Sequence, residues 1–519
     1  MSTMPTTMIV ASSAVLCLAI VYRLWREVVR DLAVLLWKAS DDLQNLCNEV
    51  MKKHGGTYVF KGPKFCNFDF VTTCDHRNAR HIFSTNFRNY ERGQDFNYMF
   101  EVLGDGIFNV DGELWKYQRQ LLQSLIGSNN EEFERHMMET LRDKTETALF
   151  PALDDAASSS RLQGRSEVVD VQDVGKRFLF DAICLLVLGF DPEEMSSSAS
   201  WAVKACDEIT EAVAFRHIVP VWMLRLQNWF QVGTEKRMRR SWRAMDRFLY
   251  RCVKTRKQEL ALANNDKSKG KDYHQPRPRF DLLTQCLMVE EDGEGEGEAV
   301  VEKQSDKFLR DTALTLILAG KETISSGLVW LLWLVATHPH VERAILDEIE
   351  QFVAVNGKAA FWSKGELTTN KMVYLHAAIC ETLRLYPPVP FQHRCAMGED
   401  LLPSGHRVRK GARMIFSICS MARMPQIWGE DCAEFKPERW IDRGTGTILP
   451  VPSHKFMTFM TGPRTCLGRA MSFLLLKSLA SAILWNYKFE VVEGHHVKPA
   501  LSVVTSMKHG LKMRVSKRR

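Results

Sequence analysis

Residues 459–468 constrain the fold of this chain more than any other stretch. They read Phe-Met-Thr-Gly-Pro-Arg-Thr-Cys-Leu-Gly, so two glycines and a proline place Cys466 in a tight loop. Glycine lets a backbone approach a planar ligand closely. An apolar helix is predicted directly after the loop, and its N-terminus and the loop N–H groups stabilise negative charge on sulfur. With Arg464 two residues away, the stretch predicts a thiolate that binds a metal.

The other cysteines indicate no second site of this kind. The chain has 13 cysteines, an odd number with scattered spacing and without a CxxC pair. This pattern argues against a zinc site and against a thioredoxin-type motif. A disulfide framework is unusual in so long a chain, so we expect the body of the protein in a reducing compartment.

The N-terminus is predicted to anchor the chain in a membrane. Residues 2–22 carry no charged side chain and are just long enough to span a bilayer as a helix. Three arginines follow between positions 23 and 30, which places the rest of the chain on the cytosolic side. A cleaved signal peptide is the alternative, although such peptides usually begin with basic residues. We predict an anchor over 1–25 and a short linker over 26–40.

Residues 41–519 are predicted to form one domain of mainly α structure with small β-sheets (α+β). Length alone suggests about three domains, but no repeat or clear boundary divides the body. Helical spacing covers 131–149, 170–190, 199–215, 234–262, 306–337 and 340–355. Strand patterns occur at 58–60, 68–73 and 412–418. Polar residues 264–279 and acidic residues 290–298 are expected to form surface loops, with a short helix over 281–288.

The apolar segment 312–336 could pass for a second membrane span. Its centre, however, contains Lys321 and Glu322, and two charges at bilayer depth are costly. We therefore expect a helix over 306–337 that runs through the core, about 48 Å long at 1.5 Å per residue.

Four further motifs occur along the chain. In order they are Trp115-Lys-Tyr-Gln-Arg119, Ala319-Gly-Lys-Glu-Thr323, Glu381-Thr-Leu-Arg384 and Phe435-Lys-Pro-Glu-Arg-Trp440. With the cysteine loop they resemble the cytochrome P-450 family of haem-thiolate monooxygenases. The resemblance covers residues 41–519. It implies a cytochrome P-450 fold with a single large haem domain, a bound haem b, and Cys466 as the axial ligand of the haem iron.

The resemblance also implies which residues hold the cofactor. Trp115, Arg119, Arg394 and Arg464 are expected to hold the two haem propionates. The planar fork of arginine suits this role because it binds a carboxylate through two parallel hydrogen bonds. His393 is an alternative to Arg394 in this role. The expected cofactor-binding residues are Trp115, Arg119, Ala319, Gly320, Arg394, Phe459, Arg464 and Gly468.

Glu381 and Arg384 are three residues apart and share one helix face. The resemblance implies that they join Arg439 in a buried ion network that is structural and holds the cysteine loop in place. A surface salt bridge is the alternative for Glu-x-x-Arg taken alone.

Glu322 and Thr323 are the expected catalytic residues, since in the family such an acid and alcohol relay protons. A Thr hydroxyl in mid-helix can bond the carbonyl four residues earlier and loosen the turn, and Gly320 permits that distortion. Glutamate stands where aspartate is commoner. Ile324 stands where a second Thr or Ser is usual, and it is expected to narrow the pocket or to alter water access.

A narrower resemblance concerns the substrate. Residues 103–115, 407–416, 428–431 and 507–511 are similar to the plant clan of fatty-acid omega-hydroxylases, closest to its mid-chain alkane hydroxylase branch. This implies hydroxylation of a fatty acid, alkane or secondary alcohol. Relatives in this branch that couple phenols oxidatively in alkaloid synthesis provide the alternative. Two further hypotheses are an isomerase or dehydratase of fatty-acid hydroperoxides and a haem carrier without turnover. The expected pocket residues are Ile107, Phe108, Phe215, Leu316, Ala319, Val389, Phe391 and Thr505.

The resemblance further implies an endoplasmic-reticulum enzyme that receives electrons from NADPH through NADPH-cytochrome P-450 reductase, with cytochrome b5 as an optional second donor. A nucleic-acid partner is not expected, because the net charge of +7 is spread along the chain. A docking patch for the reductase is expected at Lys116, Lys455, Arg469 and Lys477. Anchored relatives usually carry a Pro-rich hinge, whereas residues 25–37 contain no proline.

Overall fold

The computed structural model describes residues 42–62, 69–127, 130–162, 168–192, 200–268, 280–288, 305–365, 367 and 371–518. The predicted anchor and linker lie outside these residues, as do the acidic loop 290–298 and most of the polar segment 264–279.

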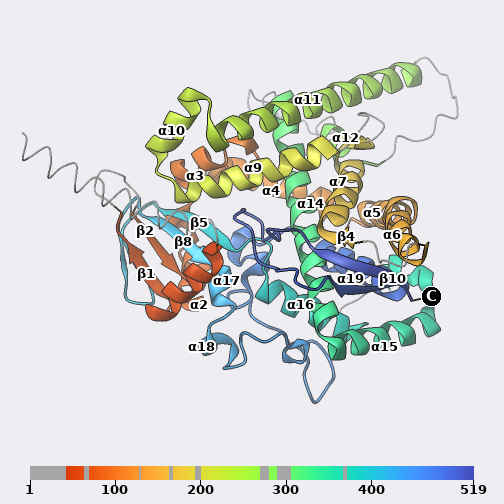
Figure 1. Cartoon of the computed structure of the whole chain (residues 1–519). Helices are drawn as coiled ribbons and strands as arrows, with labels where there is room; N and C mark the ends of the chain where they lie inside the picture. Colours follow the sequence, from red (N-terminus) through yellow and green to blue (C-terminus); the bar gives the residue numbers. More distant parts are fainter. Residues whose placement is uncertain are drawn as a thin grey trace, which may run out of the picture.

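Helices form most of the chain (Figure 1). A first helix covers residues 42–53. The α-helices that follow are α2 (His76–Arg80), α3 (Gly93–Met99), α4 (Gly112–Ile126), α5 (Glu131–Lys144), α6 (Phe150–Leu162), α7 (Val171–Leu188), α9 (Ser200–Ile218), α10 (Val221–Phe230), α11 (Gly233–Ser268), α12 (Leu282–Met288), α14 (Asp306–Thr337), α15 (Pro339–Asn356), α16 (Val373–Leu385), α17 (Ile418–Met421), α18 (Pro425–Trp428) and α19 (Arg469–Asn486). Short 3-10 or π turns are η1 (His81–Thr85), η2 (Phe87–Asn89), η3 (Glu101–Leu103), η4 (Thr145–Leu149), η5 (Lys358–Trp362), η6 (Pro437–Trp440), η7 (Met457–Phe459) and η8 (Gly462–Arg464).

Three small sheets complete the part of the fold that the structure describes. The largest has the strand order β1-β2-β8-β5-β3, and only its β2–β8 pair is parallel. The others have the orders β4-β10-β9 and β6-β7. The strands are β1 (Thr57–Phe60), β2 (Phe70–Thr73), β3 (Tyr90–Glu91), β4 (Val168–Asp170), β5 (Phe391–Ala396), β6 (Asp400–Leu401), β7 (Arg407–Val408), β8 (Arg413–Ser417), β9 (Tyr487–Val491) and β10 (Lys512–Lys517). The five-stranded sheet lies to one side of the helices in Figure 1.

Helix α14 is the centre of the helical part. It is the one described helix long and apolar enough to cross a membrane, and 78% of its most apolar stretch is buried inside the protein. This agrees with the predicted core helix. A Cβ atom on Gly320 would come within 3.0 Å of the Ile183 side chain, so this glycine lets α7 pack closely against α14.

The predicted elements differ from the observed ones mainly at their ends. The segment 131–149 is α5 followed by the π turn η4, and α6 continues directly from it. Helix α11 extends to Ser268, several residues into the predicted polar loop. Extending a helix costs less free energy than starting one, so a helix can continue into a polar segment. A prediction from composition alone therefore ends the helix too early.

Candidate functional site

The Cys466 loop is held in one shape by its own backbone. The N–H of Cys466 donates to the carbonyl of Phe459 (2.9 Å), and α19 starts at Arg469 with Gly468 as its N-cap. Gly462 has φ = +75°, and a Cβ on it would lie 1.8 Å from the carbonyl oxygen of Phe83. The loop therefore requires glycine there in order to pack against η1.

Cys466 differs from the other cysteines in its surroundings. Of the cysteines that the structure describes, it is the one whose side chain is exposed, whereas most of the others are buried. Desolvation raises the pKa of its thiol, and the Gly468 N–H and the charges of Arg119 and Arg469 offset this rise only in part. The thiol thus lies among protein groups that favour its anion, at a surface open to a ligand.

Three arginines that are buried or half-buried lie near this loop. Arg464 stacks over the ring of Trp115 (4.6 Å) and donates to Asp111 (2.5 Å), and Arg119 lies over the same ring (5.9 Å). Arg394 is 1% exposed and stacks over Phe83 at 4.9 Å.

Arg92 belongs to this cluster although the sequence motifs did not point to it. It is 7% exposed, and burial followed by the charges of Arg394 and Arg464 holds its pKa well below the usual range. Burial, and then Arg464, also lowers the pKa of Arg394 to about 9. The one sequence signal was the position of Arg92 beside a Phe-rich segment, which is too common to be informative.

The arginine cluster has more positive charge than its protein partners balance. Asp111 is the acidic residue that pairs with it, and buried guanidinium nitrogens of Arg92 (Nε) and Arg394 (Nε and Nη2) have no hydrogen-bond partner among the described residues. Burying unpaired charge is costly. A ligand with two carboxylates removes this cost, so these residues fit the two propionates of haem.

His393 and Arg394 point to different places, as neighbours on a strand do. His393 lines the large cavity, whereas Arg394 lies with Arg92 and Arg464. The geometry therefore favours Arg394 over His393 as the carboxylate ligand.

The acid and alcohol of α14 reach the same cavity. Thr323 donates its hydroxyl hydrogen to the carbonyl of Ala319 (2.7 Å), while α14 runs without a break through this turn. Glu322 is 4% exposed and pairs with Lys321 at 2.5 Å. Lys321 is fully buried and also lies 3.6 Å from Asp207.

Ile324 is not among the described residues that line the cavity, so the structure does not support the expectation that it narrows the pocket. Its side chain is 3% exposed and belongs to the hydrophobic core, because it lies on the face of α14 that packs inside the domain.

The predicted ion network around Glu381 is present as a set of contacts. Arg384 donates twice to this carboxylate (2.7 and 2.8 Å), and Arg439 donates once (3.2 Å). The indole of Trp440 donates at 2.8 Å and the backbone N–H of Lys436 at 3.1 Å. Glu381 is fully buried, so this is not a surface salt bridge.

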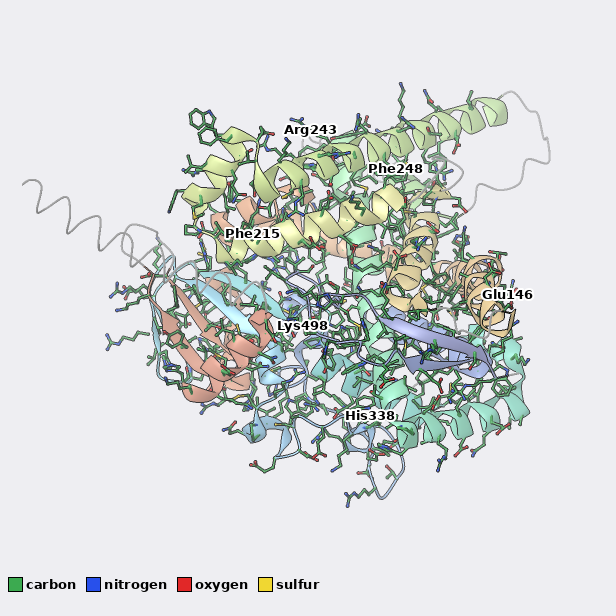
Figure 2. All side chains as sticks on the ribbon, viewed as in Figure 1. Glu146, Phe215, Arg243, Phe248, His338 and Lys498 are labelled. Carbon is green, nitrogen blue, oxygen red and sulfur yellow. The ribbon has the colours of Figure 1, made fainter. Side chains whose placement is uncertain are left out.

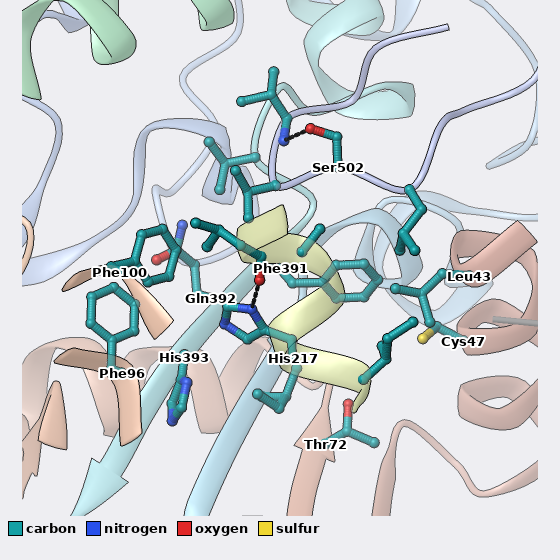
Figure 3. Close-up of a pocket in the computed structure, with 18 of the residues that line it drawn as sticks. Leu43, Cys47, Thr72, Phe96, Phe100, His217, Phe391, Gln392, His393 and Ser502 are labelled. Atoms are coloured by element: carbon teal, nitrogen blue, oxygen red, sulfur yellow. Dashed lines mark hydrogen bonds between the residues drawn. The ribbon is translucent and has the colours of Figure 1, made fainter. Parts of the chain in front are cut away.

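A cavity of about 560 Å³ lies between α9, α14 and the five-stranded sheet (Figure 3). Most of its lining is apolar. Phe108, Ala319, Val389 and Phe391 line it as predicted, and Glu322 and Thr323 line it as well.

Four predicted pocket residues are not among the described residues that line this cavity: Ile107, Phe215, Leu316 and Thr505. Thr505 is fully buried and donates to the carbonyl of Pro387 (2.7 Å). Leu316 packs against the core, and Phe215 lies on α9 (Figure 2). Their neighbours Val504, Leu318 and Ala214 line the cavity instead, an error of one or two positions.

One residue of the predicted reductase-docking patch, Lys477, is not on the surface. Lys477 is 1% exposed and donates to the carbonyl of Lys371 (2.8 Å), because the apolar helix α19 carries it into the core. Arg469 and Lys116 are exposed, and Lys455 is half-buried.

Comparison with known proteins gives one family and several relatives. The family model described as Cytochrome P450 matches residues 32–514. Alkane hydroxylase MAH1 of Arabidopsis thaliana is 38% identical over 472 residues, which cover 91% of this chain and 88% of the relative. Noroxomaritidine synthase of Narcissus aff. pseudonarcissus MK-2014 is 38% identical over 475 residues, covering 90% and 86%. Cytochrome P450 86B1 of Arabidopsis thaliana is 35% identical over 474 residues, covering 89% and 80%.

Proposed function

This chain belongs to the cytochrome P450 family and is a monooxygenase, an oxidoreductase, and we propose that it hydroxylates a C–H bond of a long-chain aliphatic substrate. The observation that carries the proposal is the position of the Glu322-Thr323 pair at a large and mostly apolar cavity. A cavity of this kind favours apolar ligands, since it removes their surface from water. The fatty acid, alkane and secondary alcohol predicted from the sequence all offer such a surface.

The residues near Cys466 fit a haem, and we assign each of them a role in binding it. Bound haem supplies the activation of dioxygen and the oxidation of the substrate. Cys466 would bind its iron as a thiolate and would donate electron density to it. Arg119, Arg394 and Arg464, with Trp115, hold the two carboxylates.

Glu322 and Thr323 of α14 are placed to transfer protons at the cavity. The hydroxyl hydrogen of Thr323 is used in its bond to Ala319, so its oxygen accepts a hydrogen bond from a ligand in the cavity. The carboxyl group of Glu322 lies at the same wall, and its contact with Lys321 at 2.5 Å fixes its position. This carboxyl group can take up a proton and pass it to a ligand beside Thr323.

A second candidate function is oxidative coupling of a phenolic amine. Noroxomaritidine synthase and the alkane hydroxylase are equally similar to the chain, at 38% identity each. The cavity also has aromatic side chains in its wall, among them Phe96 and Phe100, which suit an aromatic substrate.

We propose that electrons come from NADPH through NADPH-cytochrome P-450 reductase, with cytochrome b5 as an optional donor, and that the protein is a single-pass protein of the endoplasmic reticulum with its catalytic domain in the cytosol. One described feature supports a membrane-facing surface. Helix α10 exposes Trp222, Leu226, Trp229 and Phe230, and Trp229 is 76% exposed. Tryptophan prefers the boundary between lipid and water.

Expression in microsomes with the reductase tests the proposal. We expect NADPH-dependent hydroxylation of long-chain alkanes, fatty acids or secondary alcohols, and a thiolate-type Soret band in the reduced protein with carbon monoxide. Cys466→Ala should abolish that band. Turnover of a fatty-acid hydroperoxide without NADPH, or coupling of a phenolic amine alone, would contradict the proposed reaction. A band that survives the substitution would contradict the ligand assignment.

A further inference from the structure

Two histidines form a polar spot in the apolar wall of the cavity. His217 lies on α9 and His393 on β5, and their ring centroids are 5.9 Å apart. Phe96 packs edge-on against His393 and Phe100 against His217, each at 5.6 Å. Figure 3 shows the four rings together at one end of the cavity. They come from three separate segments of the chain, so the fold and not local sequence assembles them.

The tautomer of His217 follows from its hydrogen bond. Its Nδ1 lies 2.8 Å from the carbonyl oxygen of Val213, and a carbonyl can only accept, so Nδ1 carries the hydrogen. Burial lowers the pKa of this imidazole to about 4, and the charges of Arg413 and Arg216 act in the same direction, whereas the bond to Val213 opposes them. The ring is therefore neutral near pH 7, and its Nε2 is a bare acceptor.

His393 lacks a partner for one ring nitrogen. The side chain is 4% exposed and lines the cavity, and its Nδ1 is buried without a hydrogen bond to any described residue. Burial and the nearby groups His217, Arg413, Arg92 and Arg394 hold its pKa well below the usual range, so this ring is also neutral. A buried polar atom without a partner costs stability, so a polar contact to the part of this ring that faces the cavity is favourable.

We propose that His217 and His393 bind the hydroxyl group of an otherwise apolar substrate. The ligand O–H donates to Nε2 of His217, and the ligand oxygen accepts from the protonated nitrogen of His393. This inference rests on the proposed function, because it names the substrate class of the same cavity.

Other polar groups fit this pair less well. An ionised carboxylate has no hydrogen to donate to Nε2 of His217. Of the two arginines that line the cavity, Arg413 is already bound to Asp95 at 2.6 Å, and Arg92 belongs to the arginine cluster assigned to the haem carboxylates. A plain alkane leaves both imidazoles unpartnered. A hydroxyl satisfies both at once, and it can belong to a long-chain alcohol or to a phenol, so the experiment must distinguish these two sources.

Calorimetric titration of the purified haem-loaded protein tests the inference with matched ligands. One pair is a long-chain secondary alcohol and the alkane of the same length, and the other is a phenolic amine and its O-methyl ether. We expect the hydroxylated member of at least one pair to bind about tenfold more tightly, because it makes two hydrogen bonds to buried groups. His217→Phe keeps an aromatic ring but removes both nitrogens, and it should reduce this ratio to about one without weakening the binding of the alkane or the ether.

Controls separate the outcomes. His340→Phe is the same change at an exposed histidine on α15 and should leave both ratios intact. His393→Phe provides a second variant should His217→Phe lose its haem or fail to fold. If the histidine variants lose the preference for the hydroxylated ligand only in the alcohol pair, the natural ligand is an aliphatic alcohol. If they lose it only in the phenol pair, the natural ligand is a phenol. Equal ratios in wild type and both variants would refute the inference.

Turnover distinguishes this inference from the proposed function. If the wild-type enzyme hydroxylates aliphatic substrates while His217→Phe leaves the binding ratios unchanged, the histidine site is wrong and the proposed function stands. If a histidine-dependent hydroxyl preference appears but NADPH and reductase give no oxidised aliphatic product, the proposed function is wrong and the site stands.

Discussion

Replacing Glu381 with glutamine tests whether the buried network holds the fold together. The carboxylate accepts five hydrogen bonds, from two nitrogens of Arg384 and one each of Arg439, Trp440 and Lys436. Glutamine offers one oxygen and one NH₂ group. Two donors face Oε2 and three face Oε1, so at least two donors would point at the NH₂ in either orientation.

The expected loss of stability follows from this count. Each buried donor left without a partner costs about 1–3 kcal/mol, and removing one member of a buried ion pair costs about 3–5 kcal/mol. We expect Glu381→Gln to destabilise the haem-loaded protein by about 3–5 kcal/mol. The family match spans residues 32–514, and an unfolding entropy of about 2.1 cal/mol/K per residue then gives about 1 kcal/mol/K. The melting temperature should therefore fall by about 3–5 °C.

Thermal unfolding followed by circular dichroism measures this shift. Glu430→Gln is the matched control, since Glu430 is exposed and lies in the same segment as Asp431. The spectrum of the reduced protein with carbon monoxide should show at the same time whether the Cys466 loop still binds haem. A melting temperature of Glu381→Gln within about 1 °C of the control, with an unchanged spectrum, would refute the structural role of the network.

Three further substitutions test other parts of the site. Arg394→Ala removes a buried guanidinium from the arginine cluster and should weaken haem retention about tenfold or more, measured as haem per polypeptide after dialysis. Lys321→Met removes the cation beside Glu322 and should lower product formation about tenfold, with more NADPH electrons released as hydrogen peroxide. Asp431→Asn should lower stability near pH 7. Hydrogen bonds from Arg439 and Lys436 lower the pKa of this carboxyl to about 2, so the difference from wild type should shrink as pH falls below about 4.

Each of these substitutions has a control or an outcome that contradicts it. Arg394→Lys keeps the charge and should retain more haem than Arg394→Ala, and equal loss would point to packing instead. Lys52→Met changes an exposed lysine and should leave peroxide release unchanged. For Asp431→Asn, a difference from wild type that stays constant between pH 6 and pH 3 would show that the carboxylate contributes nothing through its charge.

The sequence predicted what depends on local pattern and missed what depends on contacts between distant segments. Helix α14, strands β1, β2 and β8 and the loop around Cys466 follow from hydropathy and spacing. The spacing of Glu381 and Arg384 also predicts their contact, whereas Arg439 was expected only from the family resemblance. The burial of Lys477 did not, because a lysine in an apolar helix can point to either side. Thr505 was misplaced by one position, since an irregular segment offers no period from which to read which side chains face inward.

The arginine and histidine groups show the same limit. Arg92 and Arg394 are about 300 positions apart, and so are the segments that carry Phe96 and His393. No spacing rule connects such residues, and their meeting is decided by how β5 and the helices pack.

The register of the five-stranded sheet separates positions where the protein can tolerate substitutions from positions where it cannot. On β2 and β8, Phe70, Thr72, Arg413 and Ile415 line the cavity, and the pairing sets Phe70 beside Arg413 and Thr72 beside Ile415. The alternating residues of the same strands, such as Val71, Met414 and Phe416, pack into a second hydrophobic core. An evolving or engineered enzyme can therefore alter its substrate range at one set of positions without disturbing the residues that keep the sheet folded. A single inserted residue in β8 would exchange the two sets and lose both properties together.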